Sequence, residues 1–398
     1  MLTRLAIKNF KSIGDPGIDL ELRPLTFLVG KNGAGKSSVL QMLMLLKQSR
    51  GSSTLELQGT LKLGSYSDIV YKLEAKRTLE VTLTIKIGML AGYPYDTALI
   101  YDLDFLTGNV ASSGVSFVID GEKFPLSPQR SVGVGSLGGD LSSLEEKFPS
   151  DFLNSLLQKA RSLVLDRLER LFYIPTLRGF TKLTHQQSSG AGGLENVEDF
   201  VWTANQAAAT ILAENPSIEE EVSSRMKMLY GIEIVHRLAP QANIVLETKE
   251  GRTRRNIINE GFGLNQVLFL VIKLVTAPID SLICIEEPEI SLHPEAQVEM
   301  TKLLAKSATE GKQILATTHS TFLLMGLSEA VQDEGIGIKP SDVIVHELEK
   351  TAEGTKLKRT IELDEKGYLK DWVSSFSKVE KRLMREFLNS LPKGKDIG

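Results

Sequence analysis

The sequence predicts an α/β fold with an antiparallel N-terminal β-subdomain, a central parallel sheet and an inserted helical subdomain. Three observations support this prediction. Apolar and polar residues alternate over most of the first 125 residues, as in half-buried strands, and an apolar period of three to four residues begins near residue 141. From residue 232 onward, short apolar strands alternate with helices, which is typical of a parallel sheet covered by helices.

The composition is that of a folded protein without a membrane segment. The 398 residues are 42% hydrophobic and 24% charged, and the length suits two to three domains at roughly 150 residues each. The single cysteine, Cys284, excludes an internal disulfide and argues against a cysteine-based zinc site. The N-terminus lacks the apolar core of a signal peptide, and no apolar run approaches the ~20 residues that span a bilayer. We therefore expect a soluble cytoplasmic protein.

The N-terminal elements follow from their apolar patterns. The run Leu25–Val29 predicts a buried strand that ends at Gly30. A helix rich in leucine and methionine is expected from Lys36 to about Gln48, closed by Gly51. The strands of the antiparallel part are expected, with glycine-containing turns between them, at 79–87, 98–105 and 115–124.

The middle of the chain begins with a glycine-rich linker at 131–140, followed by a helical period over about 141–171. A second helical block, at about 195–230, is broken near Pro216. The remaining elements are expected as a helix after Gly263, a strand at 282–285, a helix after Pro294, strands at 313–317 and 342–348, and a helix near 378–391.

A phosphate-binding motif lies between the first buried strand and its helix. The residues that match G-x-x-x-x-G-K-[ST] are Gly30, Lys31, Asn32, Gly33, Ala34, Gly35, Lys36 and Ser37, with Ser38 following. Glycines let the backbone approach phosphates closely, and the N–H groups at the start of the helix attract an anion. Lys36 would contact the β- and γ-phosphates of a nucleotide, and the Ser37 hydroxyl would hold Mg²⁺. The alternative is a glycine-rich turn that binds nothing, which this strand–helix context disfavours.

Paired carboxylates follow a second buried strand. The apolar run at 282–285 leads into Glu286 and Glu287, which we expect at the carboxyl edge of the parallel sheet, where ligands bind in such folds. Glu286 would support Mg²⁺, and Glu287 would orient and deprotonate an attacking water. In isolation, the same residues are equally consistent with an acidic strand end on the surface.

Three further segments support a family resemblance: EGFGLNQ at 260–266, SLHP at 291–294 and ATTHS at 316–320. Together with the two motifs above, they resemble the ATPase group that includes RecF, the SMC proteins and the OLD (overcoming lysogenization defect) proteins. The likeness is strongest to OLD-like bacterial AAA-family ATPases. It implies a P-loop NTPase fold with an ABC-type head, which binds ATP and Mg²⁺.

The resemblance also assigns roles and domains. It implies that His319 contacts the γ-phosphate and that residues 291–294 cross a dimer interface. Gly261 and Gly263 would belong to a signature loop that touches the nucleotide of a partner subunit, so that two heads enclose two ATP molecules. The expected division is an N-terminal head part (1–130), the inserted helical subdomain (131–231), a C-terminal head part (232–330) and an extension (331–398).

Two features depart from the family pattern. Gly261 occupies the place where many relatives carry a serine, so a hydroxyl contact to the phosphate is missing and hydrolysis is expected to be slow. The glutamine that usually helps to hold Mg²⁺ is not evident, and Gln58 is our candidate. The 68 residues after position 330 are too few for the Toprim nuclease domain of OLD nucleases, so we expect any nuclease to be a separate chain.

Weaker signals concern arginines and partners. The net charge of −4 provides no global basic field, so contact with DNA or RNA would need a local patch such as 252–255. That segment is equally typical of a solvated hairpin. Arg178 resembles a residue of OLD-like ATPases and is expected to approach the nucleotide.

Three functions remain open at this point. The first is a dimeric ATPase that serves bacterial anti-phage defence with a separate nuclease or toxin partner. The second is an ATP-gated scaffold that hydrolyses little and restrains an effector. The third is a DNA-repair ATPase like RecF.

Overall fold

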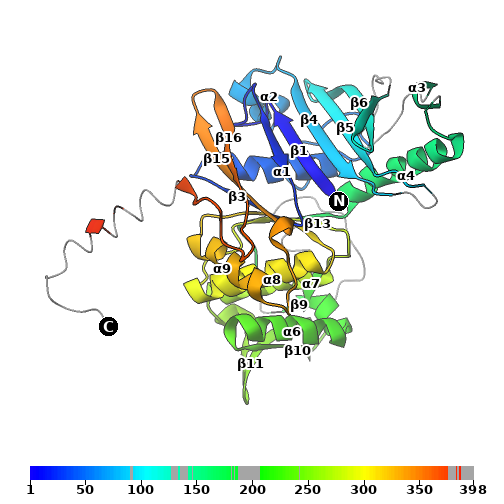
Figure 1. Cartoon of the computed structure of the whole chain (residues 1–398). Helices are drawn as coiled ribbons and strands as arrows, with labels where there is room; N and C mark the ends of the chain where they lie inside the picture. Colours follow the sequence, from blue (N-terminus) through cyan, green and yellow to red (C-terminus); the bar gives the residue numbers. More distant parts are fainter. Residues whose placement is uncertain are drawn as a thin grey trace.

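Three β-sheets organise the chain in a computed structural model (Figure 1), which describes residues 1–89, 93–126, 133–134, 142–145, 147–180, 182, 184–186, 207–241, 243–374, 382 and 385–386. The sheets are an antiparallel N-terminal sheet, a mostly parallel central sheet and a small third sheet. In this part of the chain, no helix is long and apolar enough to cross a bilayer.

The N-terminal sheet is antiparallel throughout. Its strands, in spatial order, are β2 (Ile18–Glu21), β1 (Leu2–Lys8), β4 (Leu79–Lys86), β5 (Thr97–Leu106), β6 (Asn109–Ile119) and β7 (Glu122–Pro125). The strand expected at 115–124 is divided, because Asp120 and Gly121 adopt positive φ angles and form a tight turn. The expected antiparallel subdomain is otherwise confirmed.

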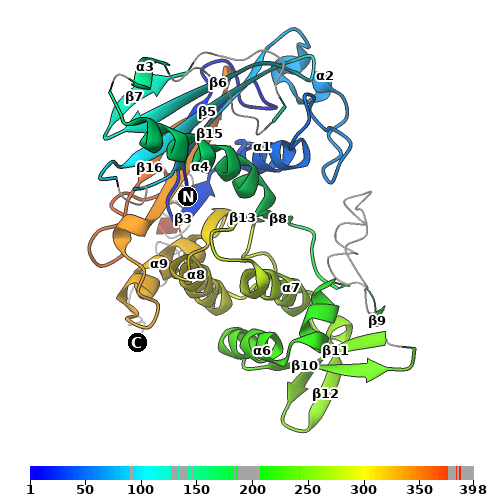
Figure 2. The same ribbon diagram turned by 90° about the vertical axis from the view of Figure 1, so that its right-hand side faces the viewer.

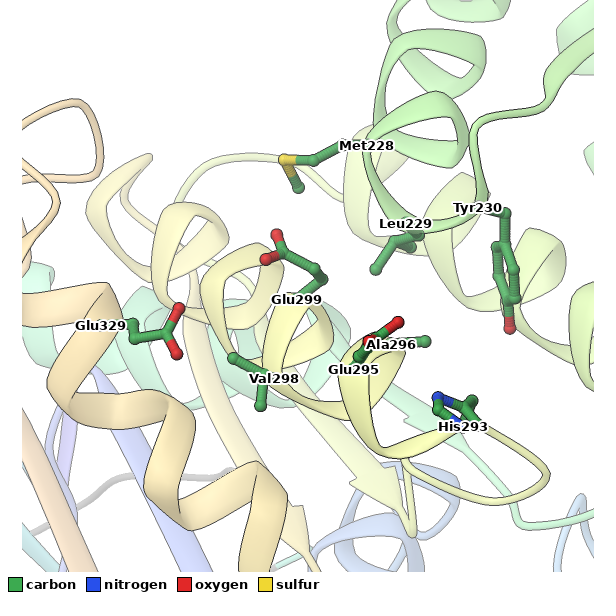
Figure 3. Close-up of a pocket in the computed structure, with 9 residues that line it drawn as sticks. All are labelled: Met228, Leu229, Tyr230, His293, Glu295, Ala296, Val298, Glu299 and Glu329. Carbon is green, nitrogen blue, oxygen red and sulfur yellow. The ribbon is translucent and has the colours of Figure 1, made fainter. Parts of the chain in front are cut away.

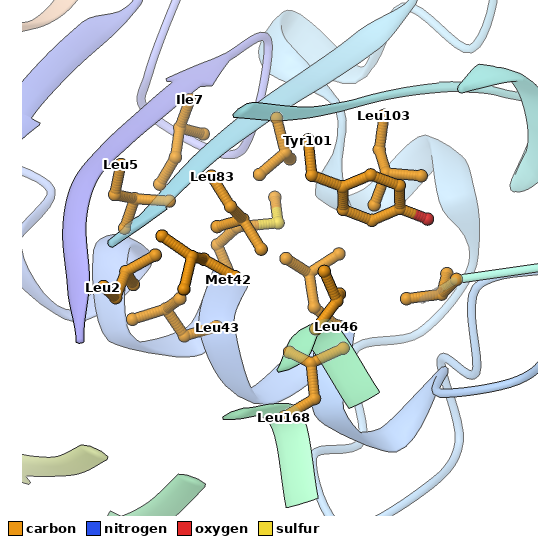
Figure 4. Packing of buried hydrophobic residues seen from close by; sticks show 14 of the residues in the cluster. Leu2, Leu5, Ile7, Met42, Leu43, Leu46, Leu83, Tyr101, Leu103 and Leu168 are labelled. Atoms are coloured by element: carbon orange, nitrogen blue, oxygen red, sulfur yellow. The ribbon is translucent and has the colours of Figure 1, made fainter. Parts of the chain in front are cut away.

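The buried face of this sheet packs on helix α1 (Lys36–Gln48), which has the predicted bounds. Burial alternates along β4 and β5, so every second side chain points to the helix. Figure 4 shows this packing for Leu5, Ile7, Leu83, Tyr101, Met42 and Leu46. The cluster fixes α1, and with it the phosphate motif at its start, against the sheet.

The central sheet carries the predicted motifs. Its strands, in spatial order, are β16 (Gly354–Ile361), β15 (Val343–Thr351), β3 (Leu25–Val29), β14 (Gln313–Thr317), β13 (Leu282–Glu286) and β8 (Leu171–Ile174). All neighbours are parallel except β16, which is antiparallel to β15. Every residue of β3, β13 and β14 is buried, because both faces of the sheet are covered.

Alternate residues of β13 face two separate cores. Leu282 and Cys284 belong to the core shared with α1, where Cys284 is fully buried. Ile283 and Ile285 face the opposite core. That core is covered by α7 (Phe262–Thr276), α8 (Pro294–Thr309) and α9 (Thr321–Gln332), which lie together below the sheet in Figure 1.

The third sheet contains β9 (His185–Gln186), β10 (Glu233–Ala239), β11 (Asn243–Glu250) and β12 (Thr253–Asn256). It lies beside α6 (Pro216–Tyr230) at the end of the molecule farthest from the N-terminal sheet, as Figure 2 shows. The shorter helices are α2 (Tyr66–Ile69), α3 (Ser142–Glu145) and the 3-10 turns at Tyr71–Leu73, Ile257–Asn259 and Pro340–Asp342.

Parts of two expected segments contribute to the central sheet and its core. Within the described residues of 131–231, strand β8 pairs with β13 and helix α4 (Ser150–Glu169) packs on the core of α1. The expected extension after residue 330 supplies β15 and β16 to the central sheet. The short run LFYI of β8 continues the apolar period of α4. The sequence pattern therefore did not distinguish this strand from the helix before it. The linker at 131–140 and the helix at 378–391 lie largely outside the described residues.

Candidate nucleotide-binding site

The phosphate motif forms a tight loop between β3 and α1. Gly30, Gly33 and Gly35 all adopt positive φ angles, of 144°, 73° and 92°. A Cβ atom at Gly30 would lie 2.3 Å from the carbonyl oxygen of Leu348 in β15, and one at Gly35 would lie 2.5 Å from Oγ1 of Thr355 in β16. Only glycine fits these two positions, so the β15–β16 hairpin forms the wall against which the loop is shaped.

Lys36, the first residue of α1, is buried beside this loop. Its Nζ donates hydrogen bonds to the carbonyl oxygens of Gly30, at 2.9 Å, and Lys31, at 3.3 Å. Burial lowers the pKa of Lys36, while nearby carboxylates oppose that shift. Ser37 is exposed at the same edge, as are Lys31, Asn32 and Gly33, whereas Ala34 and Ser38 are buried.

Glu286 ends β13 at the carboxyl edge of the sheet. One carboxylate oxygen, Oε2, accepts a hydrogen bond from Oγ1 of Thr176 at 3.1 Å. The other oxygen, Oε1, is buried and has no hydrogen-bond partner among the described residues. The Tyr173 hydroxyl lies close by, and its pKa is raised by burial and by the Glu286 charge.

This arrangement fits a bound Mg²⁺ ion. A buried carboxylate oxygen without a partner is costly unless a cation or a hydrogen-bond donor reaches it. Within the described ranges, no group of three or more histidine, cysteine, aspartate or glutamate residues could hold a metal by itself. Mg²⁺ commonly takes one or two protein ligands and completes its shell with water and phosphate oxygens, and Ser37 and Glu286 can supply those protein ligands.

Glu287 adopts a strained left-handed conformation, with φ at 44°. Its N–H donates to both the carbonyl and the hydroxyl oxygen of Thr317, at 3.1 and 3.2 Å, so β14 holds the residue in place. The Glu287 side chain is 34% exposed, and its Oε1 lies 3.8 Å from Nε2 of His319. The carboxylate is therefore accessible to water at the edge of the sheet.

His319 follows β14 and is oriented by a residue that the sequence did not single out. Oε1 of Glu289 accepts hydrogen bonds from the N–H of His319, at 2.7 Å, and from the Thr318 hydroxyl, at 2.8 Å. Burial and the nearby Lys36 charge lower the pKa of His319, and Glu287 opposes the shift. In the sequence, the signal for Glu289 is its place as the third glutamate of the run EEPE at 286–289. Once buried, such a carboxylate needs hydrogen-bond donors, which Thr318 and His319 provide.

Arg178 contacts the backbone at the end of the acidic strand β13. Its guanidinium is buried and donates to the backbone carbonyl oxygens of Pro175, Glu286 and Glu287, at 3.1, 2.7 and 2.9 Å. Burial lowers the pKa of Arg178 to about 10, which leaves the side chain charged at neutral pH. Arg178 thus holds the backbone on which the two acidic residues stand.

The structure brings four predicted residues to one edge. Lys36 interacts electrostatically with Glu286 and Glu287, and His319 interacts with both Lys36 and Glu287. These groups come from the ends of β3, β13 and β14, which are neighbours in the sheet.

Gly261 and Gln58 are not brought to this edge. Gly261 caps α7, and a Cβ atom there would have no heavy atom within 4 Å. The signature loop instead packs on the expected interface loop, since a Cβ atom at Gly263 would lie 2.3 Å from the carbonyl oxygen of Ser291. Gln58 is exposed, and its Nε2 donates to the carbonyl of Gly64 at 2.7 Å. The side chain that donates to Oε2 of Glu286 is that of Thr176.

The arginine segment 252–255 forms part of a hairpin in the third sheet. Arg254 and Arg255 are half exposed and lie 3.8 Å from the carboxylates of Glu247 and Glu260. Glu247 also pairs with Arg237 at 3.1 Å. These carboxylates partly neutralise the basic surface.

A separate cavity of about 620 Å³ lies between α6, α8 and α9 (Figure 3). Three glutamates, one histidine and the end of α6 surround it. Its lining residues are Met228, Leu229, Tyr230, His293, Glu295, Ala296, Val298, Glu299 and Glu329. None of these belongs to the phosphate motif or to the paired carboxylates.

The sequence and the fold are similar to those of known ATPase heads. The profile of a family described as "AAA ATPase domain" matches residues 1–102 and 194–324. An OLD nuclease from Thermus scotoductus is 25% identical over 340 residues, which cover 80% of this chain and 59% of that protein. This chain therefore spans less than two thirds of that relative's length.

Among solved structures, an SMC head bound to the C-terminal winged-helix domain of ScpA matches 91% of this chain and 98% of its own, with a TM-score of 0.52 and 14% identity. That likeness concerns the fold alone. The family profile covers more than half of the sequence, and both the phosphate loop and the paired carboxylates lie within the matched residues. The chain belongs to the AAA ATPase domain family; its sequence is similar to that of an OLD nuclease, and its fold is similar to that of an SMC head.

Proposed function

We propose that this chain binds and hydrolyses ATP with Mg²⁺ at the edge formed by β3, β13 and β14. The observation that carries the proposal is the convergence there of Lys36, Glu286, Glu287 and His319. One cation, two carboxylates and one imidazole supply phosphate binding, metal binding, proton acceptance and phosphate sensing.

Each residue has a distinct role in this proposal. Lys36 and the loop N–H groups bind the phosphates, while Ser37 and Glu286 hold Mg²⁺. When bound, Mg²⁺ neutralises phosphate charge and helps to align the reacting oxygens. Glu287 accepts the proton of the attacking water, since its carboxylate is exposed and its backbone is fixed on both sides. His319 is largely neutral at neutral pH, because its pKa is lowered, and it offers an N–H to the γ-phosphate.

The same geometry supports a head-to-tail dimer. Gly263 packs on Ser291 of the interface loop, and a Cβ atom at Gly261 would meet no atom of the described residues within 4 Å, so nothing joins Gly261 to the phosphate loop of its own chain. A second copy can place its α7 N-terminus on the nucleotide, where the N–H groups and the helix dipole attract the γ-phosphate. Binding of ATP then favours the closed dimer, and hydrolysis releases it.

The substitution Glu287→Gln tests this mechanism. It removes the base while keeping the size of the side chain, so steady-state turnover should fall by about 10²-fold or more. The variant should also accumulate as an ATP-bound dimer in light scattering after size exclusion. Glu365→Gln, at an exposed position, is the matched control and should behave like the wild type. A Glu287→Gln protein that stays monomeric at saturating ATP would contradict the sandwich.

The proposal for the biological setting comes from the sequence comparison. The similarity of this chain to an OLD nuclease supports a role in bacterial anti-phage defence, with the nucleotide state coupled to a nuclease, a toxin or a nucleic acid. In that setting, the efficiency of phage plating should be lower on cells that carry the intact locus than on cells that carry the Lys36→Ala variant. Equal plating would contradict the defence role without touching the ATPase.

One observation favours a second candidate, an ATP-gated scaffold. The open position at Gly261 has no side chain to contact a phosphate, which weakens the closed state needed for hydrolysis. A scaffold would bind ATP and dimerise but show the same negligible turnover in the wild type and in Glu287→Gln.

A RecF-like role is supported only by the exposed arginines at 252–255. A protein with that role would bind duplex DNA in a salt-sensitive manner.

A further inference from the structure

We infer that residues 178–180, here called the linking segment, position the base Glu287 and couple it to the signature helix α7. Arg178 holds the backbone of Glu287 at one end, and Asn265 holds Phe180 at the other. The inference rests on the proposed function, because it assigns positioning residues to the same site. These residues touch neither nucleotide nor metal in this account.

The first contact is between Arg178 and the acidic strand end. The guanidinium donates to three carbonyl oxygens, and two of them belong to Glu286 and Glu287. Glu287 has a positive φ angle, which a non-glycine residue keeps only when its surroundings fix it. Thr317 fixes its N–H side and Arg178 fixes its carbonyl side. The direction of the Glu287 carboxylate therefore depends on Arg178.

Arg178 also balances the charge of this edge. Its buried cation lies among Glu286, Glu287 and Glu289, all three of which act on it electrostatically. A planar guanidinium can serve several acceptors at once, whereas a lysine ammonium at the same place has a single nitrogen. Lysine therefore keeps the charge but lacks the two separate terminal nitrogens that serve Glu286 and Glu287.

The second contact joins the linking segment to α7. The Asn265 side chain accepts from the N–H of Phe180 at 2.7 Å and donates to its carbonyl oxygen at 2.7 Å. Gly179 has φ at 106°, and a Cβ atom there would lie 3.0 Å from the Asn265 side-chain oxygen. Asn265 is buried in the first turn of α7, four residues after Gly261. Any shift of the signature loop thus reaches Phe180.

A third contact joins the start of α7 to the segment that follows Glu287. Gly263 of α7 packs on the carbonyl of Ser291, which lies four residues after Glu287. The start of α7 is therefore tied to the base from both sides, through Phe180 and Arg178 and through Ser291. When the nucleotide of a partner subunit engages the signature loop, this rigid connection aligns Glu287 in the same chain.

The test uses Arg178→Lys, Asn265→Leu and their double variant. The matched control is Arg225→Lys, since Arg225 is also buried and donates to Glu310 and Ser307 between α6 and α8, away from the site. We measure ATP affinity, turnover, melting temperature and amide hydrogen exchange of residues 284–291. Exchange reports on local fixing of the backbone even where turnover is slow.

Arg178→Lys should lower kcat at least about tenfold, as expected for the loss of a charge-assisted hydrogen bond, with ATP affinity within about threefold of the wild type. Exchange at 284–291 should accelerate in Arg178→Lys and in Asn265→Leu but not in Arg225→Lys. Turnover in the double variant should fall by less than the product of the two single fold-decreases, because both substitutions interrupt the same connection between α7 and Glu287.

Two results would overturn the inference. One is exchange at 284–291 that matches the Arg225→Lys control in both single variants. The other is multiplicative loss of turnover in the double variant. Failure of the proposed function looks different: a wild type that binds no ATP, or binds it without turnover, leaves the exchange comparison intact and decisive.

Discussion

At the scale of the residue, the site relies on backbone contacts as much as on charge. Glu287 is held through its N–H by Thr317 and through its carbonyl by Arg178, so the strained conformation persists. His319 is oriented through its own N–H by Glu289. Such contacts leave the carboxylate and the imidazole free to face a ligand.

These residue roles differ in how far the sequence reveals them. Lys36 and Glu287 lie within motifs of fixed spacing, so they were predicted from the chain alone and the structure brings them together. Arg178 and Asn265 act through contacts to residues 109 and 85 positions away, which no local pattern encodes. Thr176 was missed for the same reason, since it meets Glu286 only through the pairing of β8 with β13.

A buried histidine near the linking segment should make stability depend on pH. His185 packs edge-on against the Phe180 ring at 5.2 Å, and burial, followed by the Lys182 charge, lowers its pKa from 6.5 to about 4. Between these two values the unfolded chain binds a proton that the folded ring does not, so acid lowers the free energy of unfolding. Urea unfolding at pH 7 and pH 5 should therefore show a smaller loss in His185→Phe than in the wild type. An equal loss in both proteins would contradict this assignment.

At the scale of the element, predictions succeeded where a run was long and its period was clear. Helix α1 and strands β3 and β14 have the predicted bounds, because each is a continuous apolar or amphipathic run with a glycine or polar stop. Strand β8 was missed, since four apolar residues directly after a helix are ambiguous in periodicity. The hairpin partner of β15 was missed because β16 is an edge strand rich in lysine and threonine.

The contact between this hairpin and the phosphate loop can be tested with glycine substitutions. Gly30→Ala would place its Cβ 2.3 Å from the carbonyl of Leu348, so β15 or the loop must move. Gly51→Ala is the matched control, since Gly51 also has a positive φ angle but open space around it. The control should lose about 1 kcal/mol of stability from strain alone and keep ATP binding.

Gly30→Ala should lose more stability than the control in urea unfolding, and ATP affinity should fall by about tenfold or more, which corresponds to about 1.4 kcal/mol. Equal losses in the two variants would show that the hairpin does not shape the loop.

At the scale of the whole molecule, two apolar cores meet at the central sheet. One core joins the N-terminal sheet to α1, and the other joins the central sheet to α7, α8 and α9. The phosphate loop begins the helix of the first core, while the signature loop begins a helix of the second. The carboxyl edge of the central sheet lies between the two cores, and in the proposed dimer the two loops of one chain engage different nucleotides. The cavity in Figure 3 belongs to the second core and its helices.

Calorimetric titration with ATP and Mg²⁺ tests the central claim most directly. The wild type should release or absorb heat with saturable binding at one nucleotide per chain, while Lys36→Ala should bind at least about tenfold more weakly, because a buried cation next to the phosphates is lost. Removal of Mg²⁺ with a chelator should weaken binding to the wild type, since Glu286 then faces the phosphates without a cation between them. Folded wild-type protein that shows no saturable heat with ATP and Mg²⁺ would contradict the account.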